Sequence, residues 1–151
     1  MKKSLVNKIL QIGIVVKDVE KSVQTWEEVY GIGPWQVFGE EASGAVTEMK
    51  VWGEYKNYSA KVAMCNVADV EIELLQPTDD ISDYARFLKE HGEGIHHLAV
   101  EEDKPAFNKL MEARHIPEIT SGVIAGFGKY MYFDTRDDLG FIAETYDLDK
   151  A

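Results

Sequence analysis

GEGIHHLAV, residues 92–100, is the segment that decides the fold, because QIGIVVKD, residues 11–18, has the same design near the beginning of the chain. In each segment a polar residue, Gln11 or His97, opens a strand in which alternate positions are aliphatic. An aspartate of the kind that caps a helix then follows, with apolar residues at helical spacing behind it. The sequence therefore indicates two copies of one folding unit.

Each half of the chain reads as a strand, a helix and three more strands, so we expect an α+β fold made of two tandem βαβββ modules. The expected strands are 11–16, 35–38, 61–66 and 70–76 in the first half and 97–101, 122–124, 130–134 and 141–146 in the second, with helices after Asp18 and Asp103 and a linking helix at 82–91. Gln11 and His97 are 86 residues apart, whereas Glu73 and Glu144 are 71 apart. We place the extra residues of the first half in segment 41–58, which also holds a short strand at 46–52.

Composition narrows the classes of function. The 151 residues suit one domain, 1–151, with module 1 at about 8–77, a linker helix at about 80–92 and module 2 at about 95–148. The formal net charge of −11 argues against nucleic-acid binding. The single cysteine, Cys65, excludes an internal disulfide and indicates a reducing compartment, so we expect a cytoplasmic protein. The apolar runs are too short to cross a membrane.

Four polar residues occupy equivalent positions of the two halves. Gln11 and His97 each open a strand, and a glycine or alanine two positions on leaves room beside them on the same face. Glu73 and Glu144 each point away from apolar neighbours in a later strand. Taken singly, such a glutamate usually faces solvent and such a histidine usually belongs to the core. Their matched placement predicts that they converge, and three oxygen donors with one imidazole suit a divalent cation of borderline hardness.

Four segments carry a resemblance to a known family. They are QIGIVVKD (11–18), IELLQP (72–77), GEGIHHLAV (92–100) and GFIAET (140–145). Together they resemble the vicinal oxygen chelate superfamily (glyoxalase / bleomycin resistance / dioxygenase), and within it methylmalonyl-CoA epimerase and glyoxalase I. The resemblance implies a curved mixed sheet that forms a half-barrel with a metal and substrate cleft and has its helices on the convex side. It also implies a homodimer.

The same resemblance implies that Gln11, Glu73, His97 and Glu144 hold one divalent metal ion, Zn, Co, Ni or Mn, and that Glu144 or Glu73 acts as the catalytic base. The function implied first is a metal-dependent isomerase or epimerase that removes a proton α to a carbonyl or thioester through a metal-stabilised enolate. A glyoxalase I-type lactoylglutathione lyase is one alternative, because eukaryotic-type glyoxalase I has glutamine where the epimerase has histidine. A non-catalytic small-molecule binding or resistance protein is the other.

The position of a second base differs from the epimerase pattern. The epimerase has a further carboxylate on a middle strand of the first half, where this chain has Lys61 or Ala63. Glu48 or Glu71 would reach the site by another route. His96 alternates to the face opposite His97, and we interpret it as structural.

Candidate substrate-binding residues come from the aromatic-rich part of the first half. They are Trp35, Trp52, Tyr55 and Lys61. Segment 41–58, with its aromatics and the flanking Tyr58, has the character of a lid over a hydrophobic substrate. The alternative is that these aromatics cover the sheet edge or a dimer contact. The expected partner is a small molecule, either a carbonyl compound or an acyl thioester.

Overall fold

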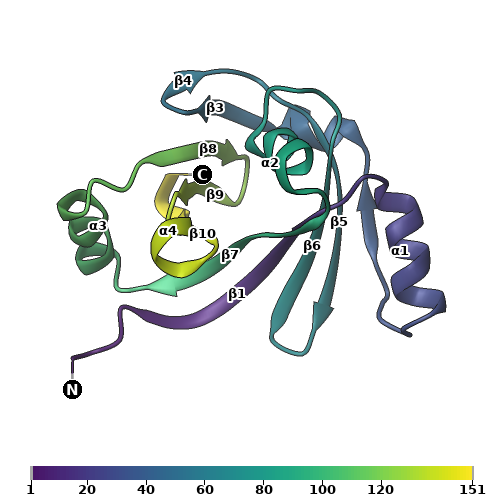
Figure 1. The fold of residues 1–151 in the computed structure, drawn as a ribbon, viewed down its shortest axis with the longest axis horizontal. Coiled ribbons are helices and arrows are strands. Elements are labelled where there is room, and N and C mark those ends of the chain that lie inside the picture. The colour runs from purple at the N-terminus through teal and green to yellow at the C-terminus, as the bar shows by residue number, and fades with distance from the viewer. Residues whose placement is uncertain (1, 151) are drawn as a thin grey trace.

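A computed structural model describes residues 2–150 of the chain (Figure 1). The described residues form one curved, ten-stranded mixed sheet with four α-helices. In chain order the elements are β1 (Val6–Val15), α1 (Val19–Glu28), β2 (Gln36–Phe38), the 3-10 helix η1 (Glu40–Ala45), β3 (Val46–Val51), β4 (Glu54–Tyr55), β5 (Ala60–Val67), β6 (Val70–Pro77), α2 (Asp83–His91), β7 (Gly94–Glu102), α3 (Lys104–Ala113), β8 (Glu118–Ile124), β9 (Gly128–Phe133), α4 (Arg136–Leu139), β10 (Ile142–Asp147) and η2 (Leu148–Lys150). The expected α+β fold of two βαβββ modules in a curved, open sheet is confirmed.

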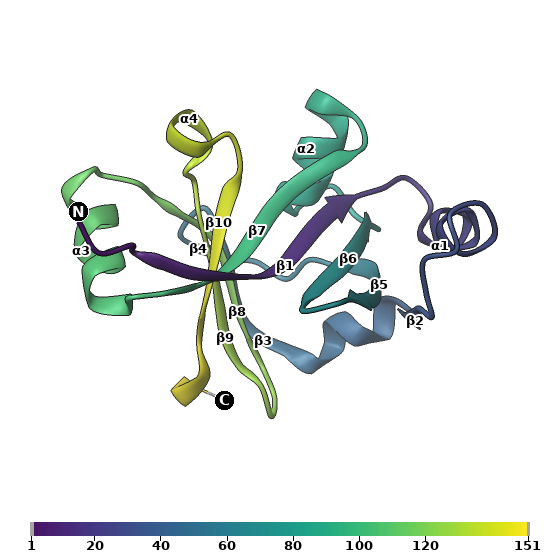
Figure 2. The same cartoon turned by 90° about the horizontal axis from the view of Figure 1, so that it is seen from below.

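The two modules meet at the centre of the sheet, where β1 and β7 run antiparallel (Figure 2). Outward from them lie β6 and β10, each parallel to its central strand, then β5 and β9, then β2 and β8. This order is what a pseudo-twofold axis between β1 and β7 produces. In the register across the junction, Gln11 is paired with Ala99 and His97 with Gly13. Each polar residue therefore lies opposite the small residue of the other module.

The extra residues of the first half form the η1–β3–β4 segment. The expected strand at 46–52 is present as β3, but it does not join the strands of its own module. It pairs antiparallel with β8, at the far edge of the second module. The chain thus leaves one edge of the sheet at β2, passes through η1 and joins the opposite edge at β3 (Figure 2). The segment consequently spans the open side of the half-barrel.

Helices α1 and α3 cover the convex face, as expected. Val19 and Trp26 of α1 pack with Leu74 of β6, and Phe107 of α3 packs with Ala143 of β10. Both helices begin after the expected aspartate caps, whose side chains accept backbone N–H groups. These contacts turn the aliphatic positions of each strand outward, so the intervening polar positions face the hollow of the sheet.

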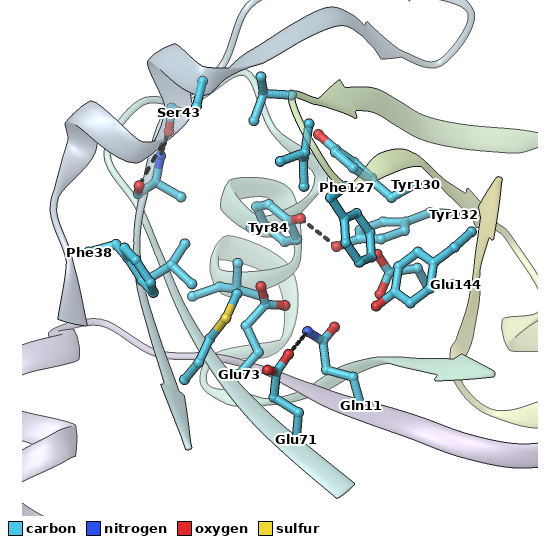
Figure 3. Close-up of a pocket in the computed structure, with 18 of the residues that line it drawn as sticks. Gln11, Phe38, Ser43, Glu71, Glu73, Tyr84, Phe127, Tyr130, Tyr132 and Glu144 are labelled. Atoms are coloured by element: carbon cyan, nitrogen blue, oxygen red, sulfur yellow. Dashed lines mark hydrogen bonds between the residues drawn. The ribbon is translucent and has the colours of Figure 1, made fainter. Parts of the chain in front are cut away.

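Helix α2 has a different position from the other two. It begins after the expected N-cap, Ser82. Its Tyr84, Phe87 and Leu88 pack with buried residues of the concave side, among them Tyr132. Helix α2 thus lies behind the cavity and helps to close it (Figure 3). The short helix α4 and the earlier beginning of β1, at Val6, are two further features that the pattern did not predict. Within residues 2–150, no helix is both long enough and apolar enough to traverse a membrane.

Candidate metal centre and substrate cavity

The four residues expected to converge lie together in the hollow of the sheet. Nε2 of His97 is 3.2 Å from Oε1 of Gln11. It is also 3.3 Å from Oε2 of Glu73 and 3.3 Å from Oε2 of Glu144. All four side chains are buried, and the imidazole is fully inaccessible. They come from the four central strands, two from each module. Figure 3 shows the glutamine and the two glutamates facing the same space.

Gly13 makes room for the imidazole. A Cβ atom at this position would lie 2.0 Å from Cε1 and 2.3 Å from Nε2 of His97. Non-bonded carbon atoms do not approach so closely, so only glycine permits the ring to take this place. Sequence spacing predicts that Gly13 leaves room beside Gln11 on its own strand, whereas the structure shows that it leaves room for His97 of the neighbouring strand.

A chain of hydrogen bonds fixes the protons of His97. Nε2 of His96 is 2.8 Å from a carboxylate oxygen of Asp83, which can only accept when ionised, so Nε2 carries the proton. Burial, the largest influence, lowers the pKa of His96 to about 4, so its ring is neutral and its Nδ1 accepts. Nδ1 of His97, 3.1 Å away, is then the donor. The prediction that His96 faces away from His97 is wrong, because the register of the β1–β7 pair shifts beside it and its ring packs against those of His97 and Tyr132. Its hydrogen bond directs the Nε2 atom of His97 toward the three oxygens.

Gln11 is oriented in a comparable way by Glu71. The amide nitrogen Nε2 of Gln11 donates to the Glu71 carboxylate at 2.7 Å, as the dashed line in Figure 3 marks. The amide oxygen therefore turns toward His97. Glu71, one of the two carboxylates considered as an additional base, lines the cavity. Glu48 does not line the cavity: its side chain is exposed, and its positive φ of 51° lies in the register shift between Thr47 and Lys50 of β3.

The carboxylates of Glu73 and Glu144 favour a positive charge next to Nε2 of His97. Burial lowers the pKa of His97, but the carboxylates of Glu144 and Glu73 outweigh burial and raise it to about 9. Burial, partly offset by His97, raises the pKa of Glu144. Oε2 of Glu144 is buried and has no hydrogen bond of good geometry. Four acceptor atoms thus meet at a point that must be occupied by a proton or a cation.

The donor set fits a divalent ion, since carboxylate, amide oxygen and imidazole are ligands of Zn, Co, Ni and Mn. Within residues 2–150, no three His, Cys, Asp or Glu side chains are already arranged to hold a metal ion. The side chains instead contact one another through His97. A metal ion would therefore have to replace the proton between them, with a small rearrangement of the oxygens.

A cavity of about 740 Å³ opens beside the four residues and runs under η1. Its walls are mostly aliphatic and aromatic side chains, and its polar end holds Glu71, Glu73 and Glu144. Two pairs of tyrosine hydroxyls lie in the wall. Tyr58 is hydrogen-bonded to Tyr130, and the hydroxyl oxygens of Tyr84 and Tyr132 are 2.6 Å apart (Figure 3). Each pair joins residues from different parts of the chain. Sequence spacing places Tyr130 and Tyr132 on one face of a strand, but gives no sign of their partners.

The expected substrate-binding residues lie away from this cavity. Trp35 packs edge-on against Trp26, with ring centroids 5.4 Å apart, and borders a second, smaller pocket. Trp52 and Tyr55 lie at the β3–β4 turn and are exposed. The ammonium group of Lys61 is 3.1 Å from the Glu20 carboxylate, on the convex side. Segment 41–58 instead contributes Ser43, Ala45, Val46, Met49 and Tyr58 to the wall of the cavity.

Comparisons with known proteins agree with the fold. A family model described as "Glyoxalase/Bleomycin resistance protein/Dioxygenase superfamily" matches residues 10–133. Among solved structures, a hypothetical protein from Bacillus halodurans has a TM-score of 0.64 at 20% identity, with 92% of each chain covered. Methylmalonyl-CoA epimerase from Mycobacterium tuberculosis has a TM-score of 0.62 at 18% identity, covering 97% of this chain and 91% of its own. A variant of the Streptomyces coelicolor epimerase, in complex with 2-nitronate-propionyl-CoA, has a TM-score of 0.62 at 19% identity, with 93% and 96% covered. A search of curated proteins found no match.

Proposed function

Because this chain belongs to the Glyoxalase/Bleomycin resistance protein/Dioxygenase superfamily, we propose that it is a metal-dependent enzyme that removes a proton α to a carbonyl or thioester group, as an isomerase or epimerase. The observation that carries the proposal is the convergence of three oxygens on Nε2 of His97 at one end of an apolar cavity. The fold that the chain shares with methylmalonyl-CoA epimerase accords with this reaction class.

Gln11, Glu73, His97 and Glu144 are the residues that would hold the ion. An ion bound there would supply positive charge next to the oxygen on which negative charge develops when the neighbouring proton leaves. The hydrogen bonds behind these side chains keep Nε2 of His97 and Oε1 of Gln11 directed at the same point.

The energetics require more than hydrogen bonds. Transfer of an α-proton to a carboxylate crosses a pKa gap on the order of 10 units, or about 14 kcal/mol. A net hydrogen bond contributes about 1 kcal/mol, and one to a charged group up to about 3. We assign the base to Glu144 or Glu73, because both carboxylates border the cavity in which the substrate carbon would lie. The apolar walls would keep water away from the carbanion that forms.

The first experiment measures bound metal. The purified protein is exposed to a mixture of Zn²⁺, Co²⁺, Ni²⁺ and Mn²⁺, dialysed and analysed by elemental mass spectrometry. The expected result is about one ion per chain. Glu144→Gln should lose the ion, whereas Glu101→Gln, which alters an exposed residue of β7, should keep it. Absence of a bound ion from the unaltered protein would overturn the proposal.

Two alternative functions use the same cavity. The amide oxygen of Gln11 at the metal point favours a glyoxalase I-type lyase as second candidate. The cavity itself, large and mainly apolar, favours non-catalytic binding of a small molecule. Exchange of α-protons for deuterium, followed by NMR with candidate carbonyl compounds and with the adduct of methylglyoxal and glutathione, separates the three. A homodimer and a cytoplasmic location remain part of this proposal, and sedimentation would test the dimer.

A further inference from the structure

The cavity is lined by neutral and acidic side chains. Twenty-two described residues line the cavity, and none of them is lysine, arginine or histidine. The charged side chains that do line it are Glu71, Glu73 and Glu144, all acidic and all at one end. A carboxylate or phosphate that entered the body of this cavity would therefore have no cation to pair with, and burial of an unpaired anion is costly.

Nearby basic side chains are engaged elsewhere. The Lys61 ammonium is paired with Glu20, the Lys50 ammonium lies 4.6 Å from the Tyr55 ring centroid, and the Arg86 guanidinium lies 5.5 Å from that of Trp52. Each of these contacts is at the outer surface of the molecule. A rearrangement of one side chain would therefore not bring a positive charge into the cavity without the loss of an existing contact.

The walls are suited to an apolar molecule. They include unbranched, branched and aromatic side chains, namely Phe38, Met49, Val62, Met64, Ile124 and Phe127. The volume of about 740 Å³ lies within the range of roughly 300–1,000 Å³ that is usual for pockets for drug-sized molecules. A ligand with a bulky aromatic or alkyl group would bury more apolar surface in this cavity than a small hydrophilic metabolite would.

The tyrosine pairs add hydrogen-bond donors without charge. In each pair one hydroxyl donates to the other, and the accepting hydroxyl keeps its own proton for a further acceptor. A phenol has an ordinary pKa of about 10, so these hydroxyls are neutral at physiological pH. A neutral phenol wall next to the carboxylate end recognises a ketone, hydroxyl or ether oxygen and offers an anion no counter-charge.

We infer that the cavity takes an uncharged, mainly apolar carbonyl compound, whose oxygen-bearing head lies at Gln11, Glu73, His97 and Glu144 and whose body lies between η1 and the tyrosine pairs. This inference rests on the proposed function for the position of the head group, and it selects a free carbonyl compound over an acyl-CoA thioester. Binding of the apolar part of the ligand does not depend on turnover. The ligand class of the cavity and the proposed enzymatic function can therefore be tested separately.

The test compares two probes of nearly equal shape. Acetylnaphthalene is neutral and naphthoate is its anionic counterpart, and both are titrated by calorimetry against the metal-loaded and the metal-free protein. We expect the metal-free protein to bind acetylnaphthalene at least about tenfold more tightly than naphthoate. Met64→Lys should reverse this preference, because lysine has a similar unbranched shape and would place a cation in the wall. Val37→Lys, which introduces lysine at an exposed position of β2, should leave the ratio unaltered.

Each outcome has a distinct meaning. Equal or tighter binding of naphthoate by the metal-free unaltered protein would overturn the inference, as would failure of acetylnaphthalene to bind. If a metal is bound but the neutral probe is not, the substrate class is wrong and the proposed function stands. If the neutral probe binds but no metal does, the proposed function fails and the cavity remains a site for neutral ligands. Circular dichroism of Met64→Lys checks that the variant is folded, and Val62→Lys serves as a second cavity variant.

Discussion

Gly13→Ala is the substitution that tests the geometry of the candidate metal centre most directly, because it adds one methyl group and removes nothing. The added Cβ would lie 2.0 Å from Cε1, 2.3 Å from Nε2 and 2.4 Å from Nδ1 of His97. Real Cβ contacts are essentially never shorter than 3.0 Å, so the imidazole or the strand must move by about 1 Å. We expect this movement to take Nε2 away from the three oxygens that it faces.

The size of the effect follows from two general quantities. Overpacking in a filled core lowers the free energy of unfolding by about 1–3 kcal/mol. Native proteins have a free energy of unfolding of about 5–15 kcal/mol, so we expect the variant to remain folded. Metal–ligand distances hold to within about 0.2 Å, so a ring displaced by about 1 Å no longer coordinates with the other three residues. We therefore expect metal affinity to fall by about 10- to 100-fold or more. A loss of about 10- to 100-fold is usual when a residue that orients a metal ligand by a hydrogen bond is removed.

The assay is a competitive metal titration of the folded variant, with thermal denaturation to measure stability. Gly94→Ala is the matched control, because a Cβ at Gly94 would meet only the Phe87 ring, at 3.9 Å, an ordinary contact. If Gly13→Ala fails to fold, the double variant Gly13→Ala/His97→Ala removes the ring that causes the clash and should recover stability without recovering metal binding. Metal affinity in Gly13→Ala equal to that of the unaltered protein would refute the reasoning.

Three other substitutions test the residues around this ring. Glu144→Ala should abolish metal binding while the fold persists, and an unchanged metal stoichiometry would refute its assignment as a ligand. Asp83→Asn should weaken metal binding by about 10- to 100-fold, because an amide can donate to His96 and so no longer fixes the proton positions; equal affinity in the competitive titration would mean that the chain of hydrogen bonds is merely structural. Glu71→Ala should free the amide of Gln11 to turn and weaken metal binding by a smaller factor. Glu71→Gln still offers that amide an acceptor and should retain more of the affinity, so an equal loss in both variants would mean that the charge of Glu71, rather than the orientation of Gln11, matters.

Much of this architecture could be predicted from local sequence. Period-2 alternation and the aspartate caps gave the strands and the helices α1 and α3, because these signals depend on neighbouring residues alone. The repeat then placed Gln11 and His97 at equivalent points, and the β1–β7 register confirms that the two strands are neighbours. The convergence of the two glutamates with them follows from the symmetry of the sheet.

Pairings between distant elements could not be predicted in this way. The strand β3 was expected, but its partner β8 begins 67 residues after β3 ends, and no residue in either strand specifies the other. The Tyr84–Tyr132 pair depends on the position of α2 at the concave side, which a linking helix does not reveal. The exposed aromatics Trp52 and Tyr55 were expected at the substrate because aromaticity is a local property. Which side of a hairpin faces a cavity depends instead on the register of its pairing.

The repeat is symmetrical in backbone and asymmetrical in the residues that support the centre. Where the first module has Glu71 to hold Gln11, the equivalent position of the second module is Ile142, and where the second has His96 behind His97, the first has Leu10. The small residues opposite the two ligands also differ between the modules. The wider imidazole of His97 lies opposite Gly13, whereas the narrower side chain of Gln11 lies opposite Ala99. An exactly duplicated unit would supply identical ligands and identical support twice. Here each module contributes one ligand whose neighbours suit that ligand alone, so the centre is a property of the paired modules and neither module would form it with a copy of itself.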